Sequence, residues 1–167
     1  MMRSEIKAFG GKAAISLSIP SKKKDGWILQ AASKKEGSNE FDWQVSIRVG
    51  LDVTEGLALA ALLMGESLEL MDMKKGERTG FYHNAPGSQT VKRVIGGIHG
   101  TFARLRVSDE AHFIDIAVCP KDRLSVSMFI YESATIMQGW QGFTSGQIRD
   151  VAKSFFQRLS SSSIQQN

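Results

Sequence analysis

The chain has 167 residues, with 21 Lys or Arg against 17 Asp or Glu, which gives a formal net charge of +4 at pH 7. This length suits one domain, and 42% hydrophobic residues allow a buried core, which excludes an intrinsically disordered chain. One cysteine excludes an internal disulfide framework, and three dispersed histidines argue against a multi-histidine metal centre. No apolar run approaches the roughly 20 residues of a membrane span. We expect a soluble, cytoplasmic protein, or alternatively one of an organellar matrix.

The positive charge is unevenly distributed along the chain. Residues 1–50 carry nine Lys or Arg against five Asp or Glu, and residues 88–167 carry nine against six. Residues 51–87, in contrast, carry three against six. Two basic blocks around an acidic segment can present one basic face to a polyanion, although an ordinary solvated surface could have the same composition.

Alternation of apolar and polar residues predicts a meander of strands in the first third of the chain. The strands are expected at residues 13–20, 27–32 and 41–50. A basic turn containing Lys22, Lys23 and Lys24 connects the first two. In the third strand, Trp43 shares the apolar face with Val45, Ile47 and Val49, which predicts that the indole faces the core.

A short helix is predicted over residues 56–64, where Ala and Leu dominate and proline is absent. Asp52 and Glu55 have the spacing of a capping box at its start, and Gly65 is a typical helix end. The helix is apolar nearly all round, which predicts that it is buried.

The second half repeats the order of strands followed by a helix. Further strands are expected at residues 67–73, 81–84, 90–95, 101–107, 112–119 and 124–131. Pro86-Gly87 ends the second of these strands, and Gly96, Gly97 and Gly100 mark a turn or bulge. A last helix begins at a capping box of Thr144 and Gln147, and its apolar stripe requires a covering surface. We expect one domain over residues 1–160 and a flexible tail over residues 161–167.

The sequence contains no recognisable catalytic constellation. It has neither a nucleophile elbow nor a zinc-protease motif, and Gly10-Gly11-Lys12 lacks the spacing of a phosphate-binding loop. Cys119 lies in an apolar stretch, which favours an inert thiol, and His83 is best explained as a structural residue. We therefore expect no enzymatic activity, no cofactor and no metal.

Several predicted strands combine aromatic or amide side chains with basic ones. Phe102, Arg104 and Arg106 share one face of their strand, and the apolar residues between them share the other. Single-stranded nucleic acid is held by such mixtures, because bases stack on flat side chains while Lys and Arg bind phosphates. Trp27 is ambiguous, since its strand is apolar on both faces. A protein-interaction scaffold is the alternative from a different functional class.

Five short motifs follow one another in residues 7–95. They are Gly11-Lys12-Ala13-Ala14-Ile15-Ser16-Leu17, Gly26-Trp27-Ile28-Leu29-Gln30, Phe41-Asp42-Trp43, Val53-Thr54-Glu55 and Phe81-Tyr82-His83-Asn84. In this order they resemble the K-G-K-A-A-L-S, G-F-V-L-L-Q, Y-D-W, V-T-E and F-F-H-D segments of the Whirly family of single-stranded-DNA-binding proteins. Lys12 matches the second lysine of the first segment, and Gly10 stands where the family has the first.

The resemblance implies an α+β fold of two antiparallel four-stranded β-sheets packed crosswise, each followed by a helix. It also implies a homo-oligomer, with a tetramer as the expected state, that binds single-stranded DNA with low sequence specificity in DNA repair, DNA maintenance or transcription regulation. RNA binding or annealing by the same fold is an alternative. A prokaryotic or phage source is expected.

The residues expected to contact nucleic acid are basic, aromatic or amide side chains of the predicted strands and turns: Lys12, Trp27, Gln30, Lys34, Lys35, Phe41, Arg48, Tyr82, Lys92, Arg93 and Phe102. The residues expected at the oligomer interface are apolar side chains of the two predicted helices: Leu59, Leu62, Phe155 and Phe156.

Overall fold

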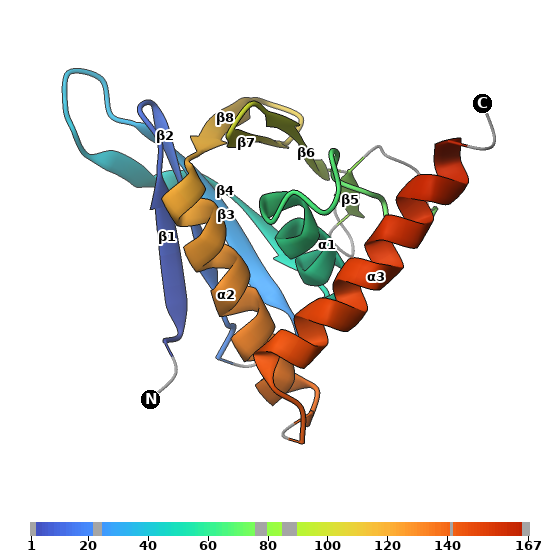
Figure 1. Ribbon diagram of the computed structural model, residues 1–167. Helices are drawn as coiled ribbons and strands as arrows, with labels where there is room; N and C mark the ends of the chain where they lie inside the picture. The colour runs from blue at the N-terminus through green and yellow to red at the C-terminus, as the bar shows by residue number, and fades with distance from the viewer. Residues whose placement is uncertain (1–2, 22–24, 76–79, 85–89, 141, 165–167) are drawn as a thin grey trace.

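The computed structural model describes residues 3–21, 25–75, 80–84, 90–140 and 142–164. It contains two antiparallel four-stranded sheets and three helices, and each sheet is followed by a helix (Figure 1). This architecture confirms the expected α+β class. The predicted lysine turn at residues 22–24, the predicted strand end at Pro86-Gly87 and the end of the predicted tail, residues 165–167, lie outside the described residues.

The first sheet has the strand order β1-β2-β3-β4. Its strands are β1 (Glu5–Phe9), β2 (Ala13–Ser18), β3 (Trp27–Lys34) and β4 (Phe41–Leu51). The sequence analysis did not predict β1, which has only five residues and in which Ala8 alone is buried. In contrast, β2 and β3 supply a continuous apolar inner face to the core.

A bulge in β4 changes which of its side chains face the core. Ala32 pairs with Ser46 and Lys34 pairs with Phe41, so two steps along β3 correspond to five along β4. Beyond the bulge the alternation shifts: Ile47 is buried, as predicted, whereas Trp43 lies beside Lys7 on the outer face. The prediction that Trp43 faces the core is therefore wrong, because it assumed an uninterrupted ladder.

Helix α1 (Val53–Leu63) follows the first sheet and is buried along nearly its whole length. The Asp52 side chain accepts the Glu55 backbone N–H at 2.8 Å, and Glu55 Oε2 accepts the Asp52 N–H at 3.0 Å, which confirms the capping box. Leu59 and Leu62 belong to the core of the protomer. Their assignment to an oligomer interface is therefore wrong, since neither side chain reaches the surface.

The second sheet has the strand order β5-β6-β7-β8. Its strands are β5 (Phe81–Asn84), β6 (Val91–His99), β7 (Phe102–Ser108) and β8 (Phe113–Val118). Gly96 and Gly97, predicted in a turn or bulge, lie inside β6, and of the three glycines only Gly100 occupies the turn, with φ +61°. The predicted strand at residues 67–73 is reduced to one isolated bridge between Glu69 and Gly97.

Residues 124–131, predicted as a strand, belong to helix α2 (Pro120–Met137). Pro120 occupies the first turn, where a backbone N–H has no acceptor within the helix, so proline loses no helical hydrogen bond there. Val126, Ile130 and Ala134 are buried at helical spacing, whereas Met128, which an alternating strand would bury, is exposed. The apolar pattern fits both periods, and contacts between α2 and the rest of the core favour the helix.

Helix α3 (Ser145–Ile164) packs against α1 and α2. Thr144 and Gln147 exchange side chain to backbone hydrogen bonds at 2.8 and 3.2 Å, as the predicted capping box requires. The helix continues through Ile164 and so includes residues 161–164, which were expected in the tail. In the described part of the chain, no helix combines the length and the hydropathy needed to cross a membrane.

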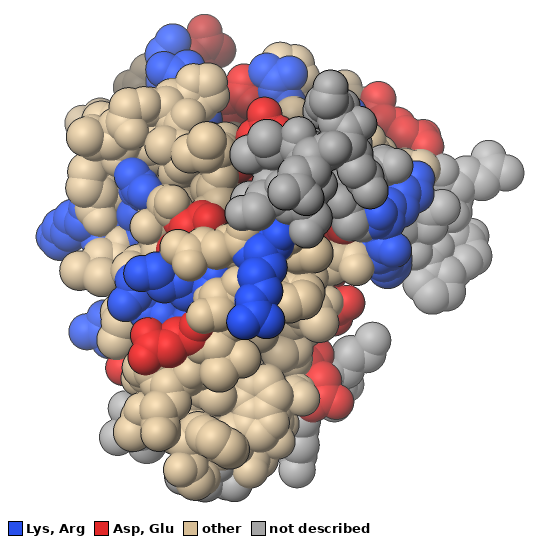
Figure 2. All heavy atoms as spheres, turned by 45° about the vertical axis from the view of Figure 1, so that its right-hand side comes forward, with Lys and Arg blue, Asp and Glu red and all other residues tan. Residues whose placement is uncertain are grey.

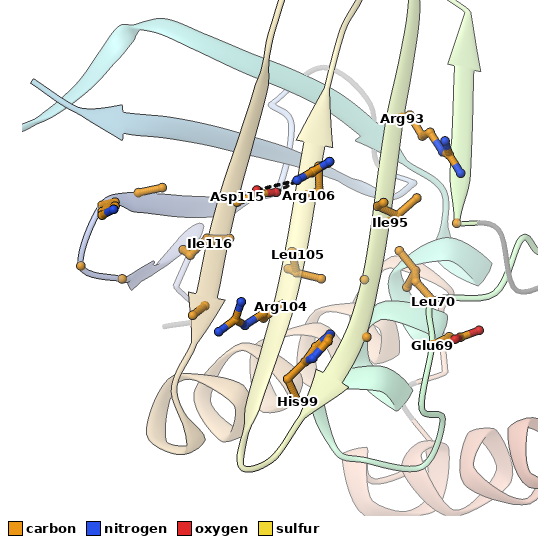
Figure 3. Close-up of a pocket in the computed structure, with 18 residues that line it drawn as sticks. Glu69, Leu70, Arg93, Ile95, His99, Arg104, Leu105, Arg106, Asp115 and Ile116 are labelled. Carbon is orange, nitrogen blue, oxygen red and sulfur yellow. Dashed lines mark hydrogen bonds and ion pairs between the residues drawn. The ribbon is translucent and has the colours of Figure 1, made fainter.

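The inner faces of both sheets and the three helices share one core. The two sheets meet where β8 contacts β1, β2 and β3. Figure 3 shows the strands of the second sheet running across those of the first, so the sheets are packed crosswise. Among the described residues, no helix covers the outer face of either sheet.

Candidate nucleic-acid interface

The outer face of the second sheet carries a surface rich in arginine and aromatic rings, called the arginine face below. Antiparallel pairing arranges its side chains in rows across the strands. The rows consist of Tyr82, Arg93, Ser108 and Phe113; of Ile95, Arg106 and Asp115; of Gly97, Arg104 and Ala117; and of His99 and Phe102.

Strict alternation in β7 sets this face toward solvent. Ala103, Leu105 and Val107 are buried in the core, whereas the side chains between them are exposed. This division of β7 agrees with the one predicted from its sequence. Tyr82 and Phe102 are 41% and 42% exposed, so both rings are accessible to a ligand.

Two arginines of this face lie against aromatic rings. The guanidinium carbon of Arg93 lies 4.8 Å from the centroid of the Tyr82 ring, and that of Arg106 lies 4.2 Å from the Phe113 ring. Both pairs are cation–π contacts between neighbouring side chains of the sheet. Each contact places a guanidinium beside an aromatic ring of the same sheet face.

Asp115 fixes the orientation of Arg106. Arg106 Nε donates to Asp115 Oδ1 at 2.6 Å, and Nη2 donates to Oδ2 at 2.8 Å, the bidentate geometry marked in Figure 3. This hydrogen bonding lowers the pKa of Asp115 and raises that of Arg106, so both groups stay charged. The result is an oriented guanidinium plane rather than a mobile charge.

A cleft of about 820 Å³ lies between the arginine face and the β1–β2 turn. Figure 3 shows Arg104 and Arg106 on β7 and His99 on β6 at this cleft. Gly97 lines it without a side chain, and a Cβ at Gly97 would meet only atoms 3.5 Å or more away. The exposed Lys12 of the turn stands at the opposite side of the cleft, so two elements of the fold supply cations to it.

The predicted residues Lys12, Tyr82, Arg93 and Phe102 therefore come together at this face or its cleft. The prediction missed His99 and Phe113, and it left Arg104 and Arg106 out of the expected contacts. Pairing of β8 with β7 places Phe113 opposite Ser108. Neighbouring strands had been predicted, but their register was unknown, and register decides which side chains share a row.

Lys92 and Arg48 lie away from the arginine face. Lys92 and Arg93 are successive strand residues and so point to opposite faces of β6. Lys92 Nζ donates to the carbonyl oxygen of Arg48 at 2.7 Å, which links the second sheet to β4 of the first. The ammonium of Lys92 thus connects the two sheets.

The remaining predicted contacts lie on or beside the outer face of the first sheet. Lys34 Nζ lies 6.0 Å from the centroid of the Phe41 ring, and Lys35 pairs with Glu40 at 3.5 Å. The Gln30 amide nitrogen donates to the Trp43 carbonyl and to Ser46 Oγ, so it stabilises the bulge of β4. These residues form a group separate from the arginine face.

Trp27, a predicted platform for bases, is buried with 1% of its side chain exposed. Its indole Nε1 donates to Ser133 Oγ of α2 at 2.8 Å, and its ring lies directly against Gly56 of α1. The prediction is therefore wrong: the indole joins three elements of the core and offers no face to a ligand.

An apolar groove of about 770 Å³ separates α1 from α3 and the segment before it. On α3, Ala152 and Phe156 are buried, whereas Val151 and Phe155 are 72% and 48% exposed. The predicted interface residue Phe155 is thus accessible, and Phe156 is not. Figure 2 shows mixed charges over the upper part of this side and a largely uncharged lower part, where α2 and α3 connect in Figure 1.

No protein-family model matches this chain, and a comparison with curated proteins finds no match. The resemblance to the Whirly family therefore remains a prediction from its short motifs.

Proposed function

We propose that this protein binds single-stranded DNA through the arginine face, with low sequence specificity and without catalysing a reaction. The observation that carries the proposal is the cross-strand arrangement of three arginines and three aromatic rings on one exposed sheet face. A role in DNA maintenance or transcription, in the cytoplasm of a prokaryote or in a phage-infected cell, is part of the proposal.

In this mechanism, bases stack and phosphates bind ionically. Tyr82 and Phe102 offer exposed rings, and the oriented guanidinium of Arg106 offers a further flat surface. Each stacked base contributes about 1–3 kcal/mol, and every base has a flat face, which explains low sequence specificity. Arg104 and Lys12 bind phosphates at the cleft, because both are exposed basic side chains that line it.

The width of the sheet limits the length of DNA that one face binds. Tyr82 and Phe113 occupy the same row on the two outermost strands. Three strand spacings of about 4.8 Å separate them, which gives about 14 Å. At about 3.4 Å per stacked nucleotide, roughly four nucleotides cross the face.

Self-association through the apolar groove completes the proposal. Phe143, Val151 and Phe155 expose apolar surface beside it, and such surface favours burial against a partner. A second copy of the chain is the proposed occupant, with a tetramer as the expected assembly.

Fluorescence anisotropy with an unstructured oligothymidine tests the binding proposal. We expect binding at low salt that weakens steeply as salt rises, because phosphate contacts release counterions. Arg104→Glu is expected to weaken binding about tenfold or more, equivalent to about 1.4 kcal/mol. Lys74→Glu makes the same charge change on an exposed loop away from the sheet and serves as the control. Absence of binding at low salt, or an affinity that does not change with salt concentration, would contradict the proposal.

Competition separates DNA from RNA. Equal lengths of unlabelled DNA and RNA of matched sequence compete for the labelled oligonucleotide, and only RNA carries the 2′-hydroxyl. We expect DNA to compete at least as well as RNA. A clear preference for RNA would instead support the alternative function, in which the same face binds RNA.

A further inference from the structure

The outer face of the first sheet carries its own cluster of rings and cations, called the lysine face below. It consists of Lys7, Phe9, Lys34, Phe41 and Trp43. Lys7 Nζ lies 5.1 Å from the centroid of the Trp43 ring, and Lys34 Nζ lies 6.0 Å from that of Phe41. The rings of Phe9 and Phe41 are 5.6 Å apart.

The bulge of β4 builds this cluster. Asp42 Oδ1 accepts the Val45 N–H, and the Trp43 carbonyl accepts from Gln30 and Ser46 side chains. A bulge interrupts the ladder and re-aims a side chain, and here it turns Trp43 toward Lys7 on the outside. Three polar side chains thus hold aromatic surface away from the core, an arrangement that core packing does not require.

The cation–π contacts of the described residues divide evenly between the two outer faces. Two pairs lie on the arginine face and two on the lysine face. Both sheet faces therefore combine exposed cations with aromatic rings.

The lysine face is open to a ligand. Phe9 is 55% exposed, and Lys7 Nζ forms an ion pair with the exposed Glu5 at 3.7 Å. Exposed ion pairs of this kind are weak, so a phosphate can replace the carboxylate. Rings for stacking and ammonium groups for phosphates are therefore combined here as they are on the arginine face.

We propose that the lysine face is a second binding site for single-stranded nucleic acid, so that one protomer holds two segments at once. The proposal rests on the function proposed above for the arginine face. The two faces belong to different sheets whose strands cross, which separates the sites in direction as well as position (Figures 1 and 3).

Stoichiometry with a short ligand tests the proposal. A six-nucleotide oligothymidine exceeds the roughly four nucleotides that cross one face yet is short enough for separate molecules to occupy the two faces. Isothermal titration calorimetry at low salt is expected to give two oligonucleotides per protomer. Phe9→Ala with Lys34→Glu should leave one high-affinity site, and Arg104→Glu should also leave one, because it weakens its own face about tenfold or more. All three changes together should leave no high-affinity site. Lys74→Glu is the matched control and should retain two.

The outcomes separate this proposal from the proposed function. If the protein binds no oligonucleotide, both fail. If it binds one per protomer, and only Arg104→Glu removes it, the arginine face stands and the second site is overturned. If the lysine-face changes reduce the light-scattering mass and leave the stoichiometry unchanged, the face is a contact between copies, which also overturns the proposal. Lys34→Glu alone, which removes no aromatic ring, provides a second variant should the double change impair folding.

Discussion

At the residue scale, Gly56 shows how one position without a side chain makes room for the largest ring of the core. A Cβ at Gly56 would lie 2.1 Å from a carbon of the Trp27 ring, and three ring atoms lie within 3 Å. The indole cannot retreat easily, because its Nε1 donates to Ser133 at 2.8 Å. Because Gly56 has no Cβ, α1 can pack closely against the Trp27 ring of β3.

We expect Gly56→Ala to destabilise the fold by about 1–3 kcal/mol, because overpacking a rigid core costs this much. If helix propensity alone decided, the same substitution would stabilise the fold by about 1 kcal/mol. The sign of the change in unfolding free energy therefore distinguishes overpacking from helix propensity. Gly50→Ala is the control, since no atom lies within 4 Å of a Cβ there. Urea unfolding measures both, and a stabilised Gly56→Ala protein would contradict the packing argument.

The residue scale is also where sequence prediction of the site failed most clearly. Trp43 was assigned to the core from alternation, whereas alternation left Trp27 ambiguous and it was expected to contact nucleic acid; both expectations were wrong. Alternation cannot reveal the bulge that turns Trp43 outward, because the bulge is held by Gln30 from another strand. Neither can it show that Trp27 finds a hydrogen-bond partner 106 positions away in α2.

At the element scale, helix α2 begins without a side-chain cap. Cys119 is the N-cap residue, with the extended backbone such a position needs, yet its side chain makes no capping hydrogen bond. Pro120 and Asp122 already favour the first turn. The missing element is a side-chain oxygen at residue 119.

We expect Cys119→Ser to stabilise the protein by about 0.5–1 kcal/mol relative to Cys119→Ala, because serine can accept an orphan N–H of the first turn. The alanine variant removes the same thiol without adding an acceptor, so it isolates the cap from the loss of sulfur. Thermal unfolding of the two variants provides the measurement. Equal stability would mean that solvent already satisfies this helix end.

A buried ion pair attaches α3 to the rest of the fold. Arg149 Nη2 donates to Glu66 Oε1 at 3.1 Å, and the Glu66 side chain is only 5% exposed. Burial raises the pKa of Glu66 above its usual value, and Arg149 opposes that rise. Removing the arginine would leave a buried carboxylate without its counter-charge.

We expect Arg149→Met to destabilise the protein by about 1–3 kcal/mol at pH 7. With the counter-charge gone, the folded pKa of Glu66 rises further above its unfolded value. The folded state then binds a proton at Glu66 more tightly than the unfolded state does. The loss of stability caused by Arg149→Met therefore becomes smaller as the pH falls through the folded pKa of Glu66. Urea unfolding at pH 7 and pH 5 tests this sign. The double variant Glu66→Gln with Arg149→Met has no carboxylate and should show no such recovery.

Elements were predicted more successfully than their roles. Both capping boxes and most strands of the first sheet follow from local spacing, because caps and turns are decided by residues close in sequence. The prediction of a strand at residues 124–131 failed, because their apolar pattern fits a strand as well as a helix. Only tertiary contacts decide between the two. The arginine face likewise depends on the register of three strand pairs, which no local pattern specifies.

At the scale of the whole molecule, the charges and the apolar surface occupy different places. Arg104 and Arg106 are exposed on the second sheet, whereas the exposed apolar side chains Phe143, Val151 and Phe155 line the groove beside α3. A self-associating nucleic-acid-binding protein benefits from this separation, because assembly then leaves the sheet faces open. Disruption of one surface should accordingly leave the other function intact.

Val151→Lys tests this separation. Val151 is 72% exposed, so the substitution should not unfold the protomer, but it would place a charge in any interface formed at the groove. We expect light scattering to show the mass of an oligomer for the unaltered protein and that of a smaller species for the variant. A monomeric mass for the unaltered protein would refute self-association, whichever surface were involved. Binding of a six-nucleotide oligothymidine per protomer should be unchanged in the variant, because no residue of the arginine face lines the groove. If Val151→Lys instead abolished binding while the protein stayed folded, the site would extend across protomers, and the separation of the two surfaces would be wrong.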